Sequence, residues 1–210
     1  MKKVKFIVFI CLFILLPLAY FNGFIRISDL TSEQESIAKK YGGVYVFDEK
    51  LEKEIDKREE ERDKYLDDFF KNNNRDFDLN DQTIMNEKLP RVLSNGKKYY
   101  VTTRDYGNDF KKQAWIPKRY SDLIVNYIGD DYNKFKPSMS FIYFYVENNE
   151  IVPISLSVTY TYKVAKFGLY GDEASGIRFK EIYYSYVLGG NRFEFINNKF
   201  EKVSNKDKDK

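Results

Sequence analysis

The sequence predicts an α+β protein with an N-terminal transmembrane helix, then a helical acidic segment, then an antiparallel meander of about five to six strands with one packed helix. Three observations predict this class. A long apolar run lies near the N-terminus, a charged stretch with helical spacing follows, and the second half alternates apolar and polar residues between tight turns. We expect a basic cytoplasmic tip over residues 1–5, a signal-anchor over 6–25, a helical membrane-proximal region over 26–93, a β-rich domain over 94–203 and a disordered tail over 204–210.

The composition is that of a globular chain that lacks the most common catalytic side chains. Of the 210 residues, 43% are hydrophobic and 32% are charged, which is typical of a folded domain. The chain has no histidine, and its one cysteine, Cys11, lies in the apolar run. This inventory excludes a Ser-His-Asp triad, a Cys-His nucleophile, histidine-ligated zinc and a disulfide within the chain.

The charge distribution argues against a nucleic-acid partner. The formal net charge is +3, and three lysines, Lys2, Lys3 and Lys5, precede the apolar run. Without these three lysines, the basic and acidic residues are equal in number. A nucleic-acid-binding domain carries its basic excess on its folded part, so we expect no nucleic acid among the partners.

Residues 6–25 form the predicted signal-anchor. At about 1.5 Å per residue, a helix of this length spans about 30 Å, which is the thickness of the hydrocarbon core of a bilayer. Because lysines precede the run, the positive-inside rule predicts a single-pass protein of the cell membrane. Its N-terminus is cytoplasmic and its C-terminal domain is periplasmic or extracellular. A cleaved signal peptide is the alternative, but cleavage after Ala19 would leave Pro17 where a small residue is expected.

The region 26–93 is predicted to be mainly helical. A capping box that begins at Thr31 or at Ser32 predicts a short first helix. Asp48 is expected to cap a long helix that runs to about Lys71. Residues 57–64 in its middle are charged on every side, which predicts a solvated stem, with a docking surface for a partner as the alternative.

The region 94–203 carries the signals of antiparallel strands. Asn95–Gly96 predicts a hairpin turn, and Pro117 begins a predicted helix that ends at Ile128. Residues 154–164 alternate strictly between apolar and polar side chains, as in a strand with one buried face. With one earlier strand, the expected strands are 44–47, 99–103, 141–146, 154–164, 177–188, 192–196 and 199–203.

Residues 76–87 have the side-chain spacing of an EF-hand calcium loop. The candidate ligands are Asp76, Asp78, Asn80, Gln82 through its backbone carbonyl, and Glu87, because alternating oxygen ligands and a distal glutamate can surround a hard cation. The motif lacks its turn glycine, which Asp81 replaces, and Pro90 interrupts the helix that should follow. The alternative is a loop rich in aspartate and asparagine that binds no metal.

Tyrosine is the most distinctive residue of the second half. Tyrosines suit protein and sugar recognition because each offers a large rigid surface with a polar tip. The candidate binding residues on the predicted strands are Tyr143, Tyr145, Tyr160, Tyr162, Tyr184 and Tyr186. The alternative is that these rings build the core in place of leucine.

These observations favour a non-catalytic binding or interaction module, anchored in the membrane and exposed on its outer side. An accessory subunit of an envelope machine and an immunity-type protein both fit. We expect the membrane, through residues 6–25, and a protein as partners, no catalytic residues, and no cofactor apart from the calcium alternative. The competing classes are a carboxylate-dependent enzyme acting on envelope glycans and a calcium-stabilised surface protein.

Overall fold

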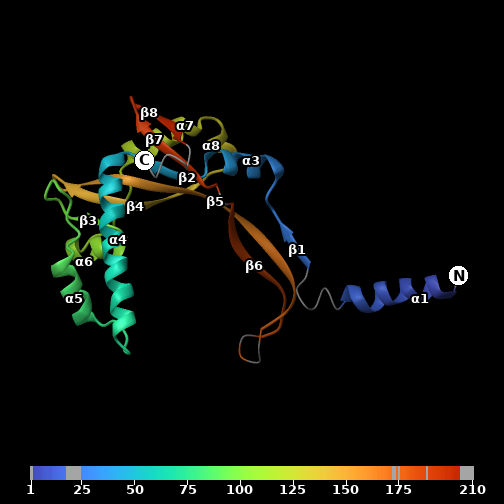
Figure 1. Ribbon diagram of the computed structural model, residues 1–210. Coiled ribbons are helices and arrows are strands. Elements are labelled where there is room, and N and C mark those ends of the chain that lie inside the picture. Colours follow the sequence, from blue (N-terminus) through green and yellow to red (C-terminus); the bar gives the residue numbers. More distant parts are fainter. Residues whose placement is uncertain (1, 18–24, 172–173, 175, 188, 204–210) are drawn as a thin grey trace.

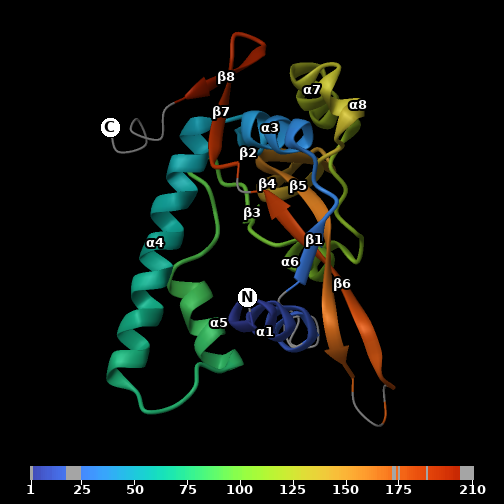
Figure 2. The same ribbon diagram turned by 90° about the vertical axis from the view of Figure 1, so that its right-hand side faces the viewer.

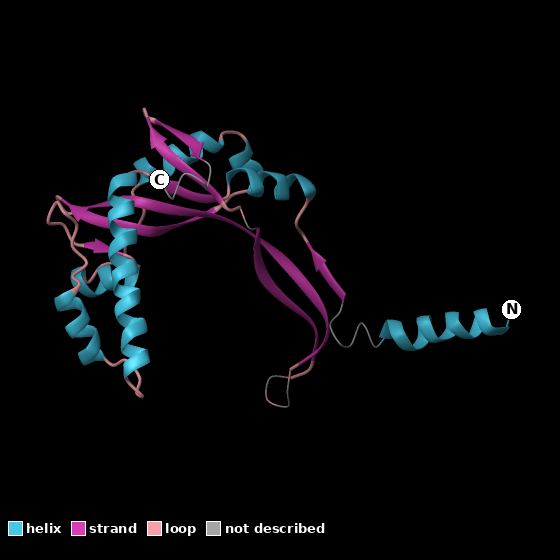
Figure 3. Ribbon diagram, viewed as in Figure 1, coloured by secondary structure: helices cyan, strands magenta, loops and turns pink. Residues whose placement is uncertain are grey.

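The computed structural model describes residues 2–17, 25–171, 174, 176–187 and 189–203. It is an α+β protein with a mixed sheet, which confirms the predicted class (Figures 1 and 3). The predicted tail over 204–210 and residues 18–24 of the predicted signal-anchor lie outside the described residues.

The described N-terminal segment is helical and carries exposed apolar side chains. Helix α1 (Lys2–Ile10) continues into a π-helix, η1 (Cys11–Leu15). Val4, Phe6 and Phe13 are all exposed. Among the helices of the described residues, none has both the length and the apolar composition that a bilayer crossing requires.

The sheet is organised around one long strand, β5 (Glu150–Tyr170). Its first half lies within the strand order β3 (Tyr99–Tyr100), β4 (Ser138–Glu147), β5, β2 (Gly43–Val46), β7 (Asn191–Ile196) and β8 (Lys199–Val203). Its second half lies between β1 (Ile25–Ser28) and β6 (Arg178–Val187), which pair with opposite edges of β5. Strands β1 and β2 precede residue 94, so the predicted helical and β-rich regions share one sheet.

One strand pair is parallel, which corrects the prediction of a purely antiparallel meander. Val44 of β2 lies opposite Ser157 of β5 in antiparallel register and opposite Arg192 of β7 in parallel register. Strand β2 lies between β5 and β7, so β7 pairs with β2 and not with β5. The turn residues on either side of β7 do not reveal that a strand from the first quarter of the chain lies there.

Residues 160–170 of β5 form a three-stranded arm with β1 and β6, which we call the arm. The pairing register aligns residues of the three strands in rows across the arm. In one such row, Ala165 lies opposite both Ile27 and Ile182. The arm extends from the central sheet in the same direction as α4 (Glu49–Asn72), whereas the β7–β8 hairpin points the opposite way (Figures 1 and 2).

The main core lies between the sheet and the helices α3 (Ser32–Tyr41) and α7 (Lys118–Ile128). It is aromatic at its centre. The fully buried ring of Tyr45 stacks on Phe193 at 4.5 Å between centroids and meets the edge of Phe200 at 4.9 Å. The predicted cap fixes the start of α3, since Thr31 closes a capping box with Gln34 there.

Helix α4 begins at the predicted cap, where Asp48 accepts a hydrogen bond from the backbone of Leu51. The prediction of a solvated middle is wrong on one side of this helix. Arg62 is only 4% exposed and donates to the backbone carbonyl of Leu89 and to the Asn86 side chain. The segment that follows α5 (Leu79–Lys88) covers this side, so the charged run is partly a polar core.

Besides α5, two short helices were not expected from the sequence. Strand β3 ends at Tyr100, short of the predicted residue 103, and α6 (Thr103–Phe110) follows. Thr102 caps this helix by accepting from the backbone of Asp105, a local signal that the sequence does contain. Helix α8 (Asp131–Lys134) follows α7 after Gly129.

Candidate binding surfaces

Three of the six candidate tyrosines belong to the interior. Tyr143 and Tyr145 pack against a buried cluster that includes Ile55 of α4, and Tyr160 is fully buried beside Phe135. The cause is that both faces of the central sheet are covered, one by α4 and the other by α3 and α7. These three rings fit the alternative in which tyrosine builds the core.

The other three tyrosines lie further along the arm than Tyr160 and do not share one face. Tyr162 lies opposite Ser185, whereas Tyr184 lies opposite Lys163 and Tyr186 opposite Thr161. Because neighbouring residues of a strand point to opposite faces, Tyr184 and Tyr186 share a face that Tyr162 does not. The exposures of this pair, 68% and 60%, show that no other part of the described chain covers them.

Two isoleucines extend this tyrosine pair across the arm. Ile27 of β1 and Ile182 of β6 both lie opposite Ala165, so they belong to the face of Tyr184 and Tyr186. They are 58% and 57% exposed. We call the surface formed by Ile27, Lys163, Ile182, Tyr184 and Tyr186 the arm face. No local sequence signal points to Ile27, because its strand pairs with residues more than a hundred positions away.

Cations border the arm face. The Nζ atom of Lys163 lies 5.9 Å from the centre of the Tyr184 ring, and that of Lys180 lies 5.6 Å from the Phe167 ring. The nearby carboxylate of Asp29 accepts a hydrogen bond from the backbone of Lys163 at 2.8 Å. The face therefore combines exposed apolar groups with cations held over aromatic rings.

The arm face continues onto a part of the sheet that α4 covers. Ser157 and Lys163 lie on the same face of β5, and Arg192 shares that face with Ser157 through Val44. There, Nη2 of Arg192 forms an ion pair with Oε2 of Glu52 on α4 at 2.5 Å. Helix α4 therefore buries one end of this face, and the arm leaves the other end open.

A hollow lies where the arm joins the central sheet. Its volume is about 420 Å³, and its lining includes Val44, Thr159, Tyr186 and Arg192. Because Tyr186 contributes to both, the hollow is continuous with the arm face. The surface is consequently concave at its root and open toward the tip.

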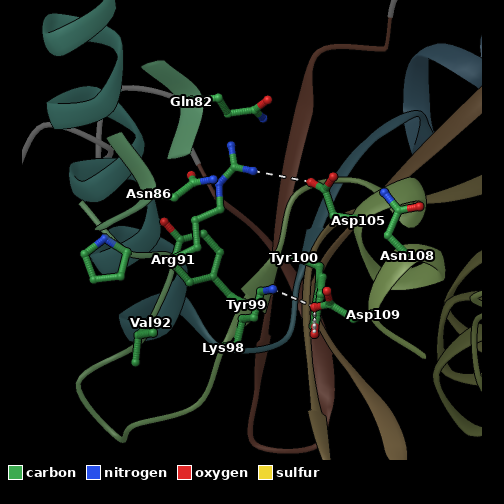
Figure 4. Close-up of a pocket in the computed structure, with 11 residues that line it drawn as sticks. Gln82, Asn86, Arg91, Val92, Lys98, Tyr99, Tyr100, Asp105, Asn108 and Asp109 are labelled. Carbon is green, nitrogen blue, oxygen red and sulfur yellow. Dashed lines mark hydrogen bonds and ion pairs between the residues drawn. The ribbon is translucent and has the colours of Figure 1, made fainter. Parts of the chain in front are cut away.

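A second, polar cleft of about 340 Å³ lies between α5, α6 and β3 (Figure 4). The guanidinium of Arg91 binds both carboxylate oxygens of Glu59, at 3.0 and 2.8 Å, and points toward Asp105 at 3.4 Å. Across the cleft, the Asp109 carboxylate accepts from Nζ of Lys98 at 2.5 Å and from the hydroxyl of a β3 tyrosine at 2.9 Å. All three of these carboxylates therefore have a cationic partner.

These partners fix the protonation state of the cleft. Burial raises the pKa of Glu59, but hydrogen bonds from Arg91 and Tyr99 outweigh it and leave the pKa lowered. The hydrogen bond from Lys98 lowers the pKa of Asp109. Both carboxylates are ionised at neutral pH, so they accept hydrogen bonds and do not supply the proton that a general acid must donate.

The predicted calcium loop is folded as a capped helix. Asp78 caps α5 by accepting from the backbones of Asn80 and Asp81, so Asn80, Gln82 and Glu87 lie on a helix that Asp76 precedes. Gln82 contributes to the lining of the polar cleft. Among the described residues, no three acidic or cysteine side chains are grouped as a metal ion would need. The sequence predicted an extended loop here, and the structure has a helix instead, because the capping box at Asp78 favours a helix.

Comparison with protein-family models, with curated proteins and with solved structures gives no match for this chain. The functional conclusion therefore depends on the geometry of the arm face and of the cleft.

Proposed function

We propose that this chain is a membrane-anchored, non-catalytic interaction module that presents the arm face to a protein partner on the periplasmic or extracellular side. One observation carries the proposal, namely the open row of Ile27, Ile182, Tyr184 and Tyr186, each more than half exposed. Contiguous apolar surface of this kind costs free energy in water and marks interaction sites on soluble domains.

The chemistry of the arm face suits a protein. Aromatic residues are enriched at the centres of protein interfaces, where their rings become fully desolvated. Strand β6 pairs only with β5 among the described strands, so its outer edge offers free backbone groups to an incoming strand. A partner with an extended apolar segment would satisfy both the edge and the face.

The N-terminal segment supports the anchoring part of the proposal. Lys2, Lys3 and Lys5 belong to the first turns of α1, and the apolar residues that follow, among them Phe6, Ile7, Val8 and Phe9, are exposed. Basic residues before a run of exposed apolar residues are typical of a membrane anchor with a cytoplasmic N-terminus. An accessory envelope subunit and an immunity-type protein are both compatible with this arrangement.

Affinity capture from native cells tests the proposal with a matched pair of variants. Ile182→Ser combined with Tyr184→Ser removes apolar area from the arm face, whereas Glu181→Ser combined with Ser185→Ala changes the opposite face of the same strand. We expect the wild type and the second variant to capture one stoichiometric partner. The amount of this partner captured by the first variant should be at least about tenfold lower. Glu181, Ile182 and Tyr184 are exposed and Ser185 is half-buried, so each single substitution should change stability by no more than about 0.5 kcal/mol. Equal capture by both variants would contradict the proposal.

A further inference from the structure

The register of β1 places the end of the predicted signal-anchor beside the tip of the arm. Strand β1 begins at Ile25, directly after residues 18–24, and Ile25 lies opposite Phe167. Only Gly168, Leu169 and Tyr170 of β5 lie beyond this row toward the tip. The point where the chain leaves a membrane anchor is therefore close to the far end of the arm.

Three of the described residues beyond that row are apolar and exposed. Leu169 and Phe179 are each 54% exposed, and Ile177 is 68% exposed. With a rise of about 3.3 Å per residue, Leu169 lies about 7 Å beyond the row of Ile25 and Phe167. This distance matches the depth of about 5–10 Å at which interfacial segments bury apolar groups in a bilayer.

Basic and aromatic side chains surround the apolar tip. Lys166, Arg178 and Lys180 lie within the last rows of the arm, and Nζ of Lys166 lies 5.5 Å from the centre of the Tyr170 ring. Tyrosine with lysine or arginine is the usual composition of a segment at headgroup level, where the ring is partly immersed and the cation meets lipid phosphate.

We propose that Leu169, Ile177 and Phe179 insert into the headgroup region of the same bilayer that holds the N-terminal segment. This inference rests on the anchoring part of the proposed function and gives the chain a second attachment to the membrane. The arm face then stands directly above the lipid surface, so its partner approaches within the plane of the membrane. A protein that covers the tip in place of lipid is the competing occupant.

Lipid quenching of a single tryptophan tests this contact in the full-length chain reconstituted in vesicles that contain anionic lipid. Trp115 is exposed and is the one tryptophan of the chain, so Trp115→Phe gives a background without tryptophan. Phe179→Trp and, independently, Ile177→Trp place the probe at the tip. Ile196→Trp places a control probe on the β7–β8 hairpin, which points away from the arm tip (Figures 1 and 2).

The expected result is that lipids brominated near the headgroup quench both tip probes and leave the control probe on the hairpin unquenched. Vesicle-bound protein whose tip probes are quenched only by aqueous iodide would overturn the tip contact and leave the anchor intact. Equal lipid quenching of the tip and control probes would also overturn it. Protein that fails to sediment with the vesicles would refute the anchor and the tip contact together.

Discussion

Glu59 joins three segments that are distant in the sequence. Its carboxylate accepts two hydrogen bonds from Arg91 and one, at 2.6 Å, from the hydroxyl of the fully buried Tyr99. Through these contacts α4 is held to the segment after α5 and to β3. The charged middle of α4 thus acts as a polar core, because Glu59 and Arg62 both have hydrogen-bonding partners there.

Replacing Glu59 by glutamine should destabilise the fold. The substitution removes the negative charge to which the half-buried Arg91 and the fully buried Tyr99 donate hydrogen bonds. We therefore expect the free energy of unfolding to fall by about 1–3 kcal/mol. Glu61→Gln, on an exposed position of the same helix, is the matched control and should change it by less than about 0.5 kcal/mol. Urea unfolding followed by circular dichroism measures both, and equal effects would refute the role of Glu59.

The start of α5 should be sensitive to acid. Hydrogen bonds from Arg75 are the largest cause that lowers the pKa of Asp81 from 3.8 to about 2, and the Asp78 backbone adds to the effect. A lowered pKa stabilises the fold above about pH 4, and this contribution is lost as the pH falls through about 2. Asp81→Asn should therefore lower the melting temperature at neutral pH, and this effect should shrink steadily as the pH falls from about 4 through about 2. A difference from wild type that stays constant across this whole range would contradict the assignment.

Single tyrosines show what could be predicted at this scale. The sequence identifies strands that carry tyrosines, and Tyr160 and Tyr184 lie on adjacent strands of one sheet. The sequence does not show which of the two is buried. Tyr160 is buried under α3 and α8, whereas no described helix covers Tyr184. Burial here depends on where helices end in three dimensions, which no local pattern records.

Among the elements, the arm depends on a close backbone contact at its root. A Cβ atom on Gly189 would lie 2.1 Å from the carbonyl oxygen of Gly42, so only glycine allows the two chains to approach. Gly42 in turn ends α3, and β2 begins at the next residue. The contact thus links the start of the central sheet to the base of the arm.

Gly189→Ala should therefore be strongly destabilising, since its neighbour is backbone and cannot rotate away. Gly107→Ala is the control, because a Cβ there meets its nearest atom at an ordinary 3.5 Å inside α6. We expect the control to stabilise the protein by about 0.5–1 kcal/mol and Gly189→Ala to lower its melting temperature. Differential scanning calorimetry distinguishes them, and a neutral Gly189→Ala would show that the contact is not needed.

Elements with strong local signals were predicted well, and those defined by distant partners were not. Capping residues and periodicity locate α3, α4, α7 and most strands of the second half to within a few residues. The exception is β5, predicted over 154–164, which extends from Glu150 to Tyr170 and so supplies the central strand of the arm. The parallel pairing of β2 with β7 and the placement of β1 on the arm were missed. Both depend on contacts between residues more than a hundred positions apart, which periodicity does not encode.

At the scale of the whole molecule, one strand connects two parts with different roles. The first half of β5 belongs to a covered central sheet that holds the core, and its second half supports an open arm. The arm carries apolar side chains that contribute nothing to the described interior, and its tip lies beside the residues that follow the N-terminal segment. The architecture therefore separates a packed body from an exposed apolar surface on the arm.

Site-specific photo-crosslinking in native cells tests the central claim most directly. A photoreactive amino acid at Tyr184 probes the arm face, and the same group at Glu181, exposed on the opposite face of β6, is the control. The account predicts one discrete crosslinked protein from position 184 and none of that mass from position 181. The same product from both positions, or no product from position 184 in cells that express the membrane-bound chain, would contradict an interaction module that binds through the arm face.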